Sequence, residues 1–141
     1  MTTPPPPLPE PAKALVGRIV KNTHAPMPWE VNAAIDTIRL EIDAGVRRLD
    51  EERTRLPHLA RTYRAKKARA FLTGTGTVKD REAQAELASL SERMDVEVCE
   101  QTIHAGRENL DALRTGLSAL QTINAQIRTE MTALTGFGGR P

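Results

Sequence analysis

Large aromatic side chains are scarce in this sequence. Phe, Tyr and Trp account for 3% of its 141 residues, so a buried interior must be built from aliphatic side chains. Aliphatic side chains suit the narrow contact between paired helices better than the broad interior of a β-sandwich or an α/β enzyme. The scarcity of aromatic residues therefore argues against both of those fold classes.

Cysteine and long apolar runs are also lacking. Cys99 is the only cysteine, which excludes an internal disulfide. No apolar run approaches the roughly 18 to 20 residues that span a bilayer, and the beginning of the sequence lacks the basic and apolar regions of a signal peptide. We expect a cytoplasmic protein without a membrane partner, in which Cys99 packs between helices.

The residue sets of common active sites are absent as well. His24, His58 and His104 have no partners at zinc-binding spacing, and neither HExxH nor CxxC occurs. Cys99 and His104 are five residues apart, so they lie on different faces of a helix and cannot form a nucleophilic pair. We expect no enzyme, no metal, no cofactor and no small-molecule substrate.

Ala, Leu, Glu and Arg dominate the middle of the chain, whereas Gly and Pro gather mainly at its ends. This composition is typical of an all-α protein. We predict one helical domain over residues 12–134, between a disordered proline-rich tail at 1–11 and a flexible glycine-rich tail at 135–141. Within the domain we expect helices at 12–22, 28–72 and 78–134, with a turn at 73–77.

Apolar residues recur at spacings of three and four through residues 31–63. This pattern indicates a heptad seam, along which one helix packs against another. Pro28 suits the first turn of this helix, because the amide hydrogen that proline lacks has no partner there. Pro57 lies inside the series and should cost about 3 kcal/mol, so we expect a kinked but continuous helix.

Threonine and glycine alternate in residues 73–77. We expect Gly74 to adopt the left-handed conformation that ends many helices. Thr77 stands three residues before Asp80, which is the arrangement of an N-cap pair at the start of the next helix. The segment lacks the GxxxxGK[ST] spacing of a phosphate-binding loop, so a turn between helices accounts for its glycines.

The last predicted helix has a regular seam from Ile103 to Leu134. The apolar residues before this seam do not keep its register, and they are Leu87, Leu90, Met94 and Val98. We therefore expect a stutter between Met94 and Ile103. With the turn centred near Thr75, residues whose numbers add to about 150 should face one another in a helical hairpin.

Together these patterns predict a long antiparallel helical hairpin, a coiled coil, with the short N-terminal helix packing at its base. Two helices leave much of a heptad stripe exposed, so we expect a homo-oligomer that forms through the seam. Asn124 occupies a seam position, where a polar residue can fix the register between copies.

Positive charge is unevenly distributed. Residues 61–81 carry seven cations against Asp80 alone, a formal charge of +6 in a chain of +2. We predict an anion-binding site at the hairpin tip, formed by Arg61, Arg64, Lys66, Lys67, Arg69, Lys79 and Arg81. Such a cluster suits the phosphates of DNA without sequence preference. The alternatives are that it docks on an acidic protein surface or stays solvated.

The stretch Ala60–Ala70, the Gly/Thr turn and Val78–Ala85 resemble small helical-hairpin proteins from the early regions of tailed phages and prophages of Gram-positive bacteria. The resemblance covers about residues 55–130. It implies an accessory role in the host cytoplasm, on DNA or on a DNA-processing protein of recombination or replication, and it brings no catalytic residues. Hairpins secreted by the type VII pathway are similar in architecture, but they carry a Trp-x-Gly turn that this sequence lacks.

Two function hypotheses follow. The first is a non-catalytic phage-type accessory protein that binds DNA or a DNA-processing protein through its basic tip. The alternative is a structural, assembly or host-enzyme-inhibiting protein that acts through helical contacts, including the base near Trp29.

Overall fold

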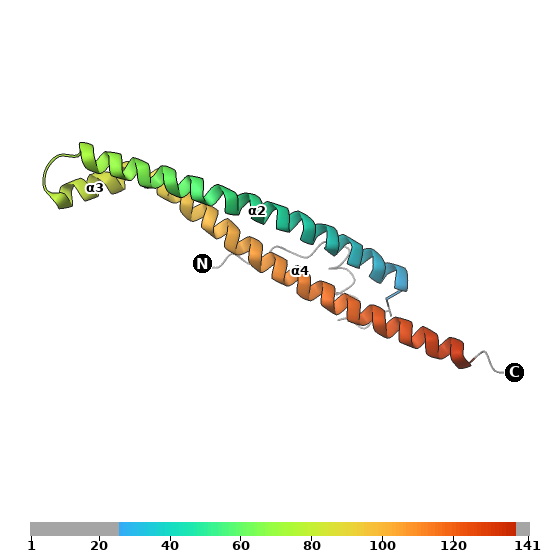
Figure 1. Ribbon diagram of the computed structural model, residues 1–141. Coiled ribbons are helices and arrows are strands. Elements are labelled where there is room, and N and C mark those ends of the chain that lie inside the picture. The colour runs from blue at the N-terminus through green and yellow to red at the C-terminus, as the bar shows by residue number, and fades with distance from the viewer. Residues whose placement is uncertain (1–25, 138–141) are drawn as a thin grey trace. The chain divides into compact units, whose positions relative to one another are not determined.

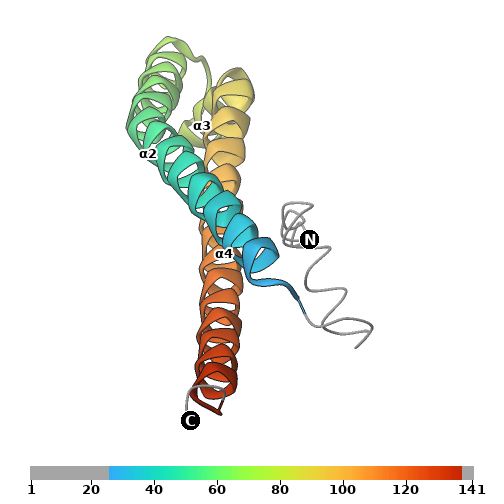
Figure 2. The same ribbon diagram turned by 90° about the vertical axis from the view of Figure 1, so that its right-hand side faces the viewer.

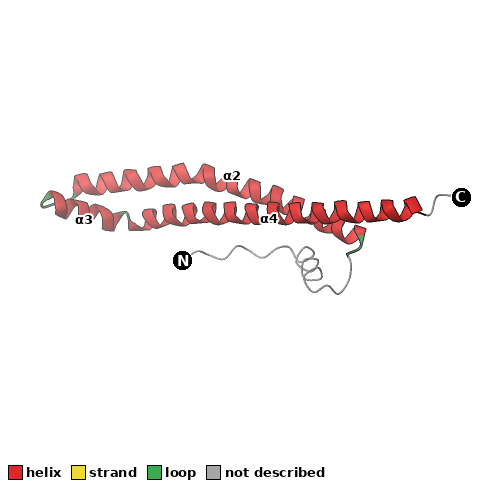
Figure 3. Ribbon diagram, turned by 90° about the horizontal axis from the view of Figure 1, so that it is seen from below, coloured by secondary structure: helices red, strands yellow, loops and turns green. Residues whose placement is uncertain are grey.

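The computed structural model describes residues 26–137, and all of its regular structure is helical. Three helices follow one another, α2 (Pro28–Thr73), α3 (Val78–Ala88) and α4 (Leu90–Phe137) (Figure 3). The described part of the chain contains no strand, so the prediction of an all-α protein is confirmed. The proline-rich tail at 1–11 and the helix at 12–22 are predictions that lie outside the described residues.

Helix α2 begins at Pro28, as predicted, and ends one residue beyond the predicted end. Its opening turn is held by Glu30, whose carboxylate accepts a hydrogen bond from the Met27 amide at 3.0 Å. Pro57 lies inside the helix without ending it. The seam residues on both sides of Pro57 stabilise a continuous helix, because their burial outweighs the loss of one backbone hydrogen bond.

The turn between α2 and α3 returns the chain so that α3 lies beside the end of α2 (Figures 1 and 2). Gln84 braces it, donating to the Thr75 carbonyl at 3.0 Å and accepting from the Thr75 amide at 3.2 Å. The predicted N-cap pair of Thr77 and Asp80 is confirmed as a capping box. The prediction for Gly74 is wrong, since the left-handed residue is Gly76, with a φ of 97°.

Gly74 serves the turn in a different way, through close packing. A Cβ atom at this position would lie 2.9 Å from Oε1 of Gln84 and 3.2 Å from the Ala70 carbonyl oxygen. A larger residue at position 74 would therefore displace the Gln84 side chain from the turn. The turn therefore requires glycine at two positions, at Gly76 for its left-handed backbone and at Gly74 because a Cβ atom has no room there.

Residues 78–137 form two helices where the sequence predicted a single one. The interruption is at Ser89, which is fully buried and whose hydroxyl donates to the Ala85 carbonyl at 2.6 Å. The Ser89 hydroxyl and the Ser89 amide both donate to the Ala85 carbonyl. Competition for one carbonyl weakens the helical hydrogen bond, which explains why the helix is interrupted at this residue. At the other end α4 includes Thr135, Gly136 and Phe137, three residues that were predicted to belong to the flexible tail.

The chain divides into two compact units. The described part of unit 1 comprises residues 26–46 and 108–137, and unit 2 comprises Arg47–Arg107. In a pair of long helices, each buried side chain contacts only residues at the same height along the helix axes. Side chains that are far apart along the helices therefore do not share one central core. This local burial accounts for two units rather than one.

Unit 1 has an aliphatic core. Its buried members come from the first part of α2 and the second part of α4, namely Val31, Ala34, Ile35, Ile38, Leu113 and Leu120. Four half-buried apolar residues pack around them: Ile42, Leu117, Ile123 and Ile127. All of these residues except Ala34 and Ile123 belong to the predicted seam and repeat at spacings of three and four, so the sequence pattern predicted most of the unit 1 core.

Unit 2 buries several small or polar side chains on α3 and the beginning of α4. On α3 and α4 the inward positions are Ala85, Ser89, Glu92, Val96, Cys99 and Ile103. They keep an almost unbroken spacing of three and four, so the predicted stutter before Ile103 is wrong. The apolar residues assigned to this seam are exposed instead, and they are Leu87, Leu90, Met94 and Val98.

Candidate functional site

The seven predicted cations all lie in unit 2, close to the turn. Arg61, Arg64, Lys66, Lys67 and Arg69 belong to the last part of α2, and Lys79 and Arg81 belong to α3 (Figure 1). The turn at residues 74–77 brings the two groups to one end of the unit. The grouping that the sequence predicted is therefore present, but its members differ in their surroundings.

Lys66 and Lys67 are paired with carboxylates of the facing helices. The Lys66 ammonium group donates to Glu92, and that of Lys67 donates to Glu86. These two acids lie outside residues 61–81, so a charge count over that stretch misses them. They compensate two of the seven cations, so Lys66 and Lys67 also stabilise the contact between the helices.

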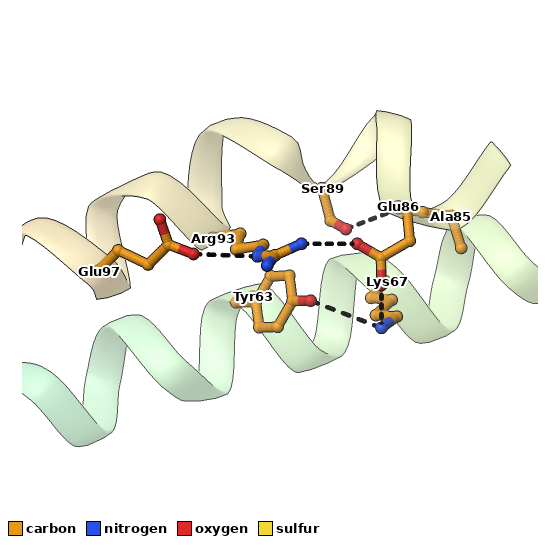
Figure 4. A network of polar contacts seen from close by, with 7 residues as sticks. All are labelled: Tyr63, Lys67, Ala85, Glu86, Ser89, Arg93 and Glu97. Carbon is orange, nitrogen blue, oxygen red and sulfur yellow. Dashed lines mark hydrogen bonds and ion pairs between the residues drawn. The ribbon is translucent and has the colours of Figure 1, made fainter. Parts of the chain in front are cut away.

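The Lys67 pair belongs to a small network (Figure 4). Glu86 also contacts the Arg93 guanidinium at 3.5 Å, and Arg93 in turn contacts Glu97 at 3.1 Å. The Lys67 ammonium lies 5.7 Å from the centre of the Tyr63 ring and 3.5 Å from its hydroxyl oxygen. Tyr63 lies one turn before Lys67 on α2, so this contact holds the lysine side chain against its own helix.

Hydrogen bonding shifts the pKa values of these groups. The bond from Lys67 lowers the pKa of Glu86, and the bond from Lys66 lowers that of Glu92, both from an ordinary value of 4.5. The bond to Glu86 raises the pKa of Lys67 above its ordinary 10.5. Each of these three shifts favours the charged form, so Glu86, Glu92 and Lys67 are ionised at neutral pH.

These shifts predict a loss of stability in acid. The pKa values of Glu86 and Glu92 are lowered in the folded chain, so their contribution is complete well above 4.5 and is lost as the pH falls below it. The melting temperature of the Glu86→Gln/Glu92→Gln variant should therefore fall less between pH 7 and pH 3 than that of the unmodified chain. Circular dichroism measures this difference, and Glu82→Gln, which changes an exposed acid of α3, is the control. An equal acid-induced fall in the variant would contradict the assignment.

Five cations remain after the two paired lysines are set aside. They are Arg61, Arg64, Arg69, Lys79 and Arg81, and within residues 26–137 no ion pair to a carboxylate is found for any of them. All are exposed except Arg81, which is half-buried. The Nε atom of Arg81 is buried and has no hydrogen-bond partner in the described residues. We call these five residues the basic cluster.

Cys99 is buried in unit 2, as predicted, with 2% of its surface exposed. Its thiol donates to the Glu52 carboxylate at 3.2 Å. Burial raises the pKa of the Cys99 thiol, and the bond to Glu52 raises it further. The thiol is therefore held protonated at neutral pH, which does not favour a nucleophilic role.

Unit 1 contains a polar groove that the sequence did not predict as a site. Its volume is about 760 Å³, and its lining residues include Asn32, Asp36, Arg39, Asn124 and Arg128. Asn124, predicted to set the register between copies, donates to Asn32 of the same chain at 3.4 Å. The predicted role of Asn124 between copies is untested, but its side chain already has a partner within the chain.

Two further searches concern residues 26–137. No helix there carries an apolar stretch sufficient to cross a bilayer. No three His, Cys, Asp or Glu side chains there are grouped as metal ligands would be. Comparison of the chain with known protein families, curated proteins and solved structures finds no match.

Proposed function

We propose that this chain is a non-catalytic, phage-type accessory protein whose basic cluster binds the phosphate backbone of DNA. The observation that carries the proposal is that, within residues 26–137, five cations near one turn have no carboxylate partner. Cations that are neither paired nor deeply buried are free to exchange their counterions for phosphates. Binding of this kind is independent of sequence, because phosphate contacts position a protein without reading bases.

The proposal includes an antiparallel hairpin with the cluster at its tip. Within unit 2 the cross-helix contacts join Glu52 to Cys99 and Lys67 to Glu86, so residue numbers rise on α2 as they fall on the facing helix. Within unit 1, Asn32 contacts Asn124, and Gly45 faces Leu110. In each of these four contacts the two residue numbers add to between 151 and 156, close to the sum of about 150 expected for a hairpin with its turn near Thr75. This agreement supports the antiparallel topology.

A salt titration tests the proposal. If all five cations contact phosphates, the slope of log K against log salt should be about −4.5, and the affinity should fall about 500-fold between 50 and 200 mM salt. The Arg61→Gln/Arg64→Gln variant should weaken binding to a short DNA duplex and reduce the slope by about 2. Fluorescence anisotropy measures both quantities.

The matched control is Arg47→Gln/Arg48→Gln. It removes the same charge from exposed arginines of the same helix that precede Gly74, where the turn begins, by 26 and 27 residues. The proposal requires the control to retain the original slope. Absence of binding at low salt, or the same loss of affinity in both variants, would refute a localised site for DNA.

The second candidate is a structural, assembly or enzyme-inhibiting protein that acts through helical contacts. It is favoured by apolar side chains exposed in unit 1, since Trp29 is 67% exposed and Leu134 is 75% exposed. Docking of the basic cluster on a DNA-processing protein, the other form of the first candidate, would be salt-sensitive without binding of naked DNA, whereas a protein that acts through its helical faces should lose no partner when the cluster is neutralised. Neutralisation of the cluster therefore separates the two candidates.

A further inference from the structure

In unit 2, α3 and the beginning of α4 expose an apolar face. Leu87, Leu90, Met94 and Val98 have between 47% and 76% of their surface accessible. Their spacings of three, four and four residues place them on one side of the helices. We call these four residues the outer stripe. It lies opposite the inward positions Ala85, Ser89 and Cys99, which are each at most 2% exposed.

The placement of large apolar side chains on the exposed side of α3 and α4 reverses the usual pattern of a surface helix. An amphipathic helix turns its large apolar side chains toward its own core and its small or polar ones toward water. Here two leucines, a methionine and a valine face outward, while alanine, serine and cysteine face the partner helix. Single exposed leucines are common, but a continuous apolar stripe of this kind marks a contact surface.

We propose that a second copy of this chain covers the outer stripe, with the two stripes antiparallel about a twofold axis. The stripe is self-complementary in that arrangement, because Leu87 falls opposite Val98 of the other copy and Leu90 falls opposite Met94. The residue numbers of these pairs add to 185 and 184, so one axis between residues 92 and 93 satisfies both. Identical patches meeting about a twofold axis form the commonest kind of homodimer contact.

The borders of the stripe permit this pairing. One border carries Gln84, Ser91, Asp95 and Thr102, of which only Asp95 is charged. The other carries Glu86, Arg93 and Glu97, where the arginine contacts both acids within its own chain. Asp95 is exposed at the edge of the stripe, where water can still reach its carboxylate, so pairing leaves no isolated charge buried in the contact.

The size of the stripe predicts a reversible dimer. With its borders, a pair of stripes would bury roughly 1,000 Å² in total, which is at the lower limit for specific contacts. The seam predicted to join copies is already used within the chain, since Leu110, Leu113 and Leu120 are buried there. The outer stripe is thus a contact separate from the seam and from the basic cluster.

Sedimentation velocity of the full chain without nucleic acid tests the proposal. The unmodified chain should change from monomer to dimer between about 1 µM and about 1 mM. The Leu90→Gln/Met94→Gln variant should weaken the dimer at least about tenfold, whereas Leu40→Gln, at a leucine of α2 that is 70% exposed, should not. Circular dichroism verifies that each variant keeps its helix content.

Disulfide crosslinking tests the orientation. In a Cys99→Ser background, a mixture of the Leu90→Cys and Met94→Cys variants should form a mixed disulfide faster than either variant forms its own. Faster formation of the unmixed disulfides would refute the antiparallel arrangement. A chain that stays monomeric at about 1 mM, or a dimer unaffected by Leu90→Gln/Met94→Gln, would overturn the proposal and leave the stripe to a different protein. Both experiments are carried out without DNA. A negative result would therefore refute the dimer through the outer stripe without affecting the proposal that the basic cluster binds DNA.

Discussion

Replacement of Ile38 by alanine should lower the free energy of unfolding by about 2–4 kcal/mol. Ile38 is 1% exposed and belongs to the buried cluster of unit 1 with Ile35 and Leu113. The substitution removes three carbon atoms, and the surrounding helices can only partly close the resulting cavity. Since small domains have a total stability of about 5–15 kcal/mol, this loss would be a large share of it.

Urea denaturation followed by far-UV circular dichroism measures this change. Leu40→Ala is the matched control, because Leu40 lies two residues away on α2 and is 70% exposed. It should change the free energy of unfolding by less than about 0.5 kcal/mol. Similar losses in both variants would show that Ile38 is not packed in the core as described.

Leu110→Ala should lower the free energy of unfolding by about 2–4 kcal/mol for a related reason. Leu110 is 3% exposed and fills the space that Gly45 leaves on the facing helix. A Cβ atom at Gly45 would lie 2.9 Å from Cδ2 of Leu110, which is closer than van der Waals contact allows. The two residues should therefore be energetically coupled.

A double-mutant cycle measures that coupling. Gly45→Ala improves helix propensity by about 1 kcal/mol, but in the unmodified chain the contact with Leu110 opposes this gain. In the Leu110→Ala background the opposition is gone, so Gly45→Ala should stabilise by about 1 kcal/mol. Gly136→Ala is the control, since a Cβ there meets nothing within 4 Å. Equal effects of Gly45→Ala in both backgrounds would exclude the contact.

Local signals in the sequence predicted several features of the structure correctly. Pro28 marks the start of α2, and Thr77 with Asp80 marks the start of α3. Each signal depends on hydrogen bonds within a few residues, so no knowledge of the partner helix is needed. The sequence did not predict the role of Gly74, because that role depends on a residue of the next helix. The Gln84 side chain bonds to Thr75, nine residues earlier, and leaves no room for a Cβ atom at position 74.

The charge available at the turn cannot be obtained by counting charged residues along the sequence. The grouping of seven cations is visible in the sequence, but Glu86 and Glu92 approach Lys67 and Lys66 only after the chain has turned back. A count over residues 61–81 therefore overstates the charge offered to a partner. The register of the two helices decides which cations are paired and which remain for the basic cluster.

The sequence by itself determined that this protein is helical, where its turn lies, and that its cations gather around that turn. Helix propensity, capping and composition are properties of short segments, and they are expressed wherever the segment is placed. The tertiary structure decided which side of residues 85–99 faces inward. Periodicity within these residues favours burial of the outer stripe, because it contains the largest apolar side chains. The inward positions keep one spacing of three and four residues from Ile103 back to Ala85, and the packing of that whole series against α2 outweighs the local preference of a few residues.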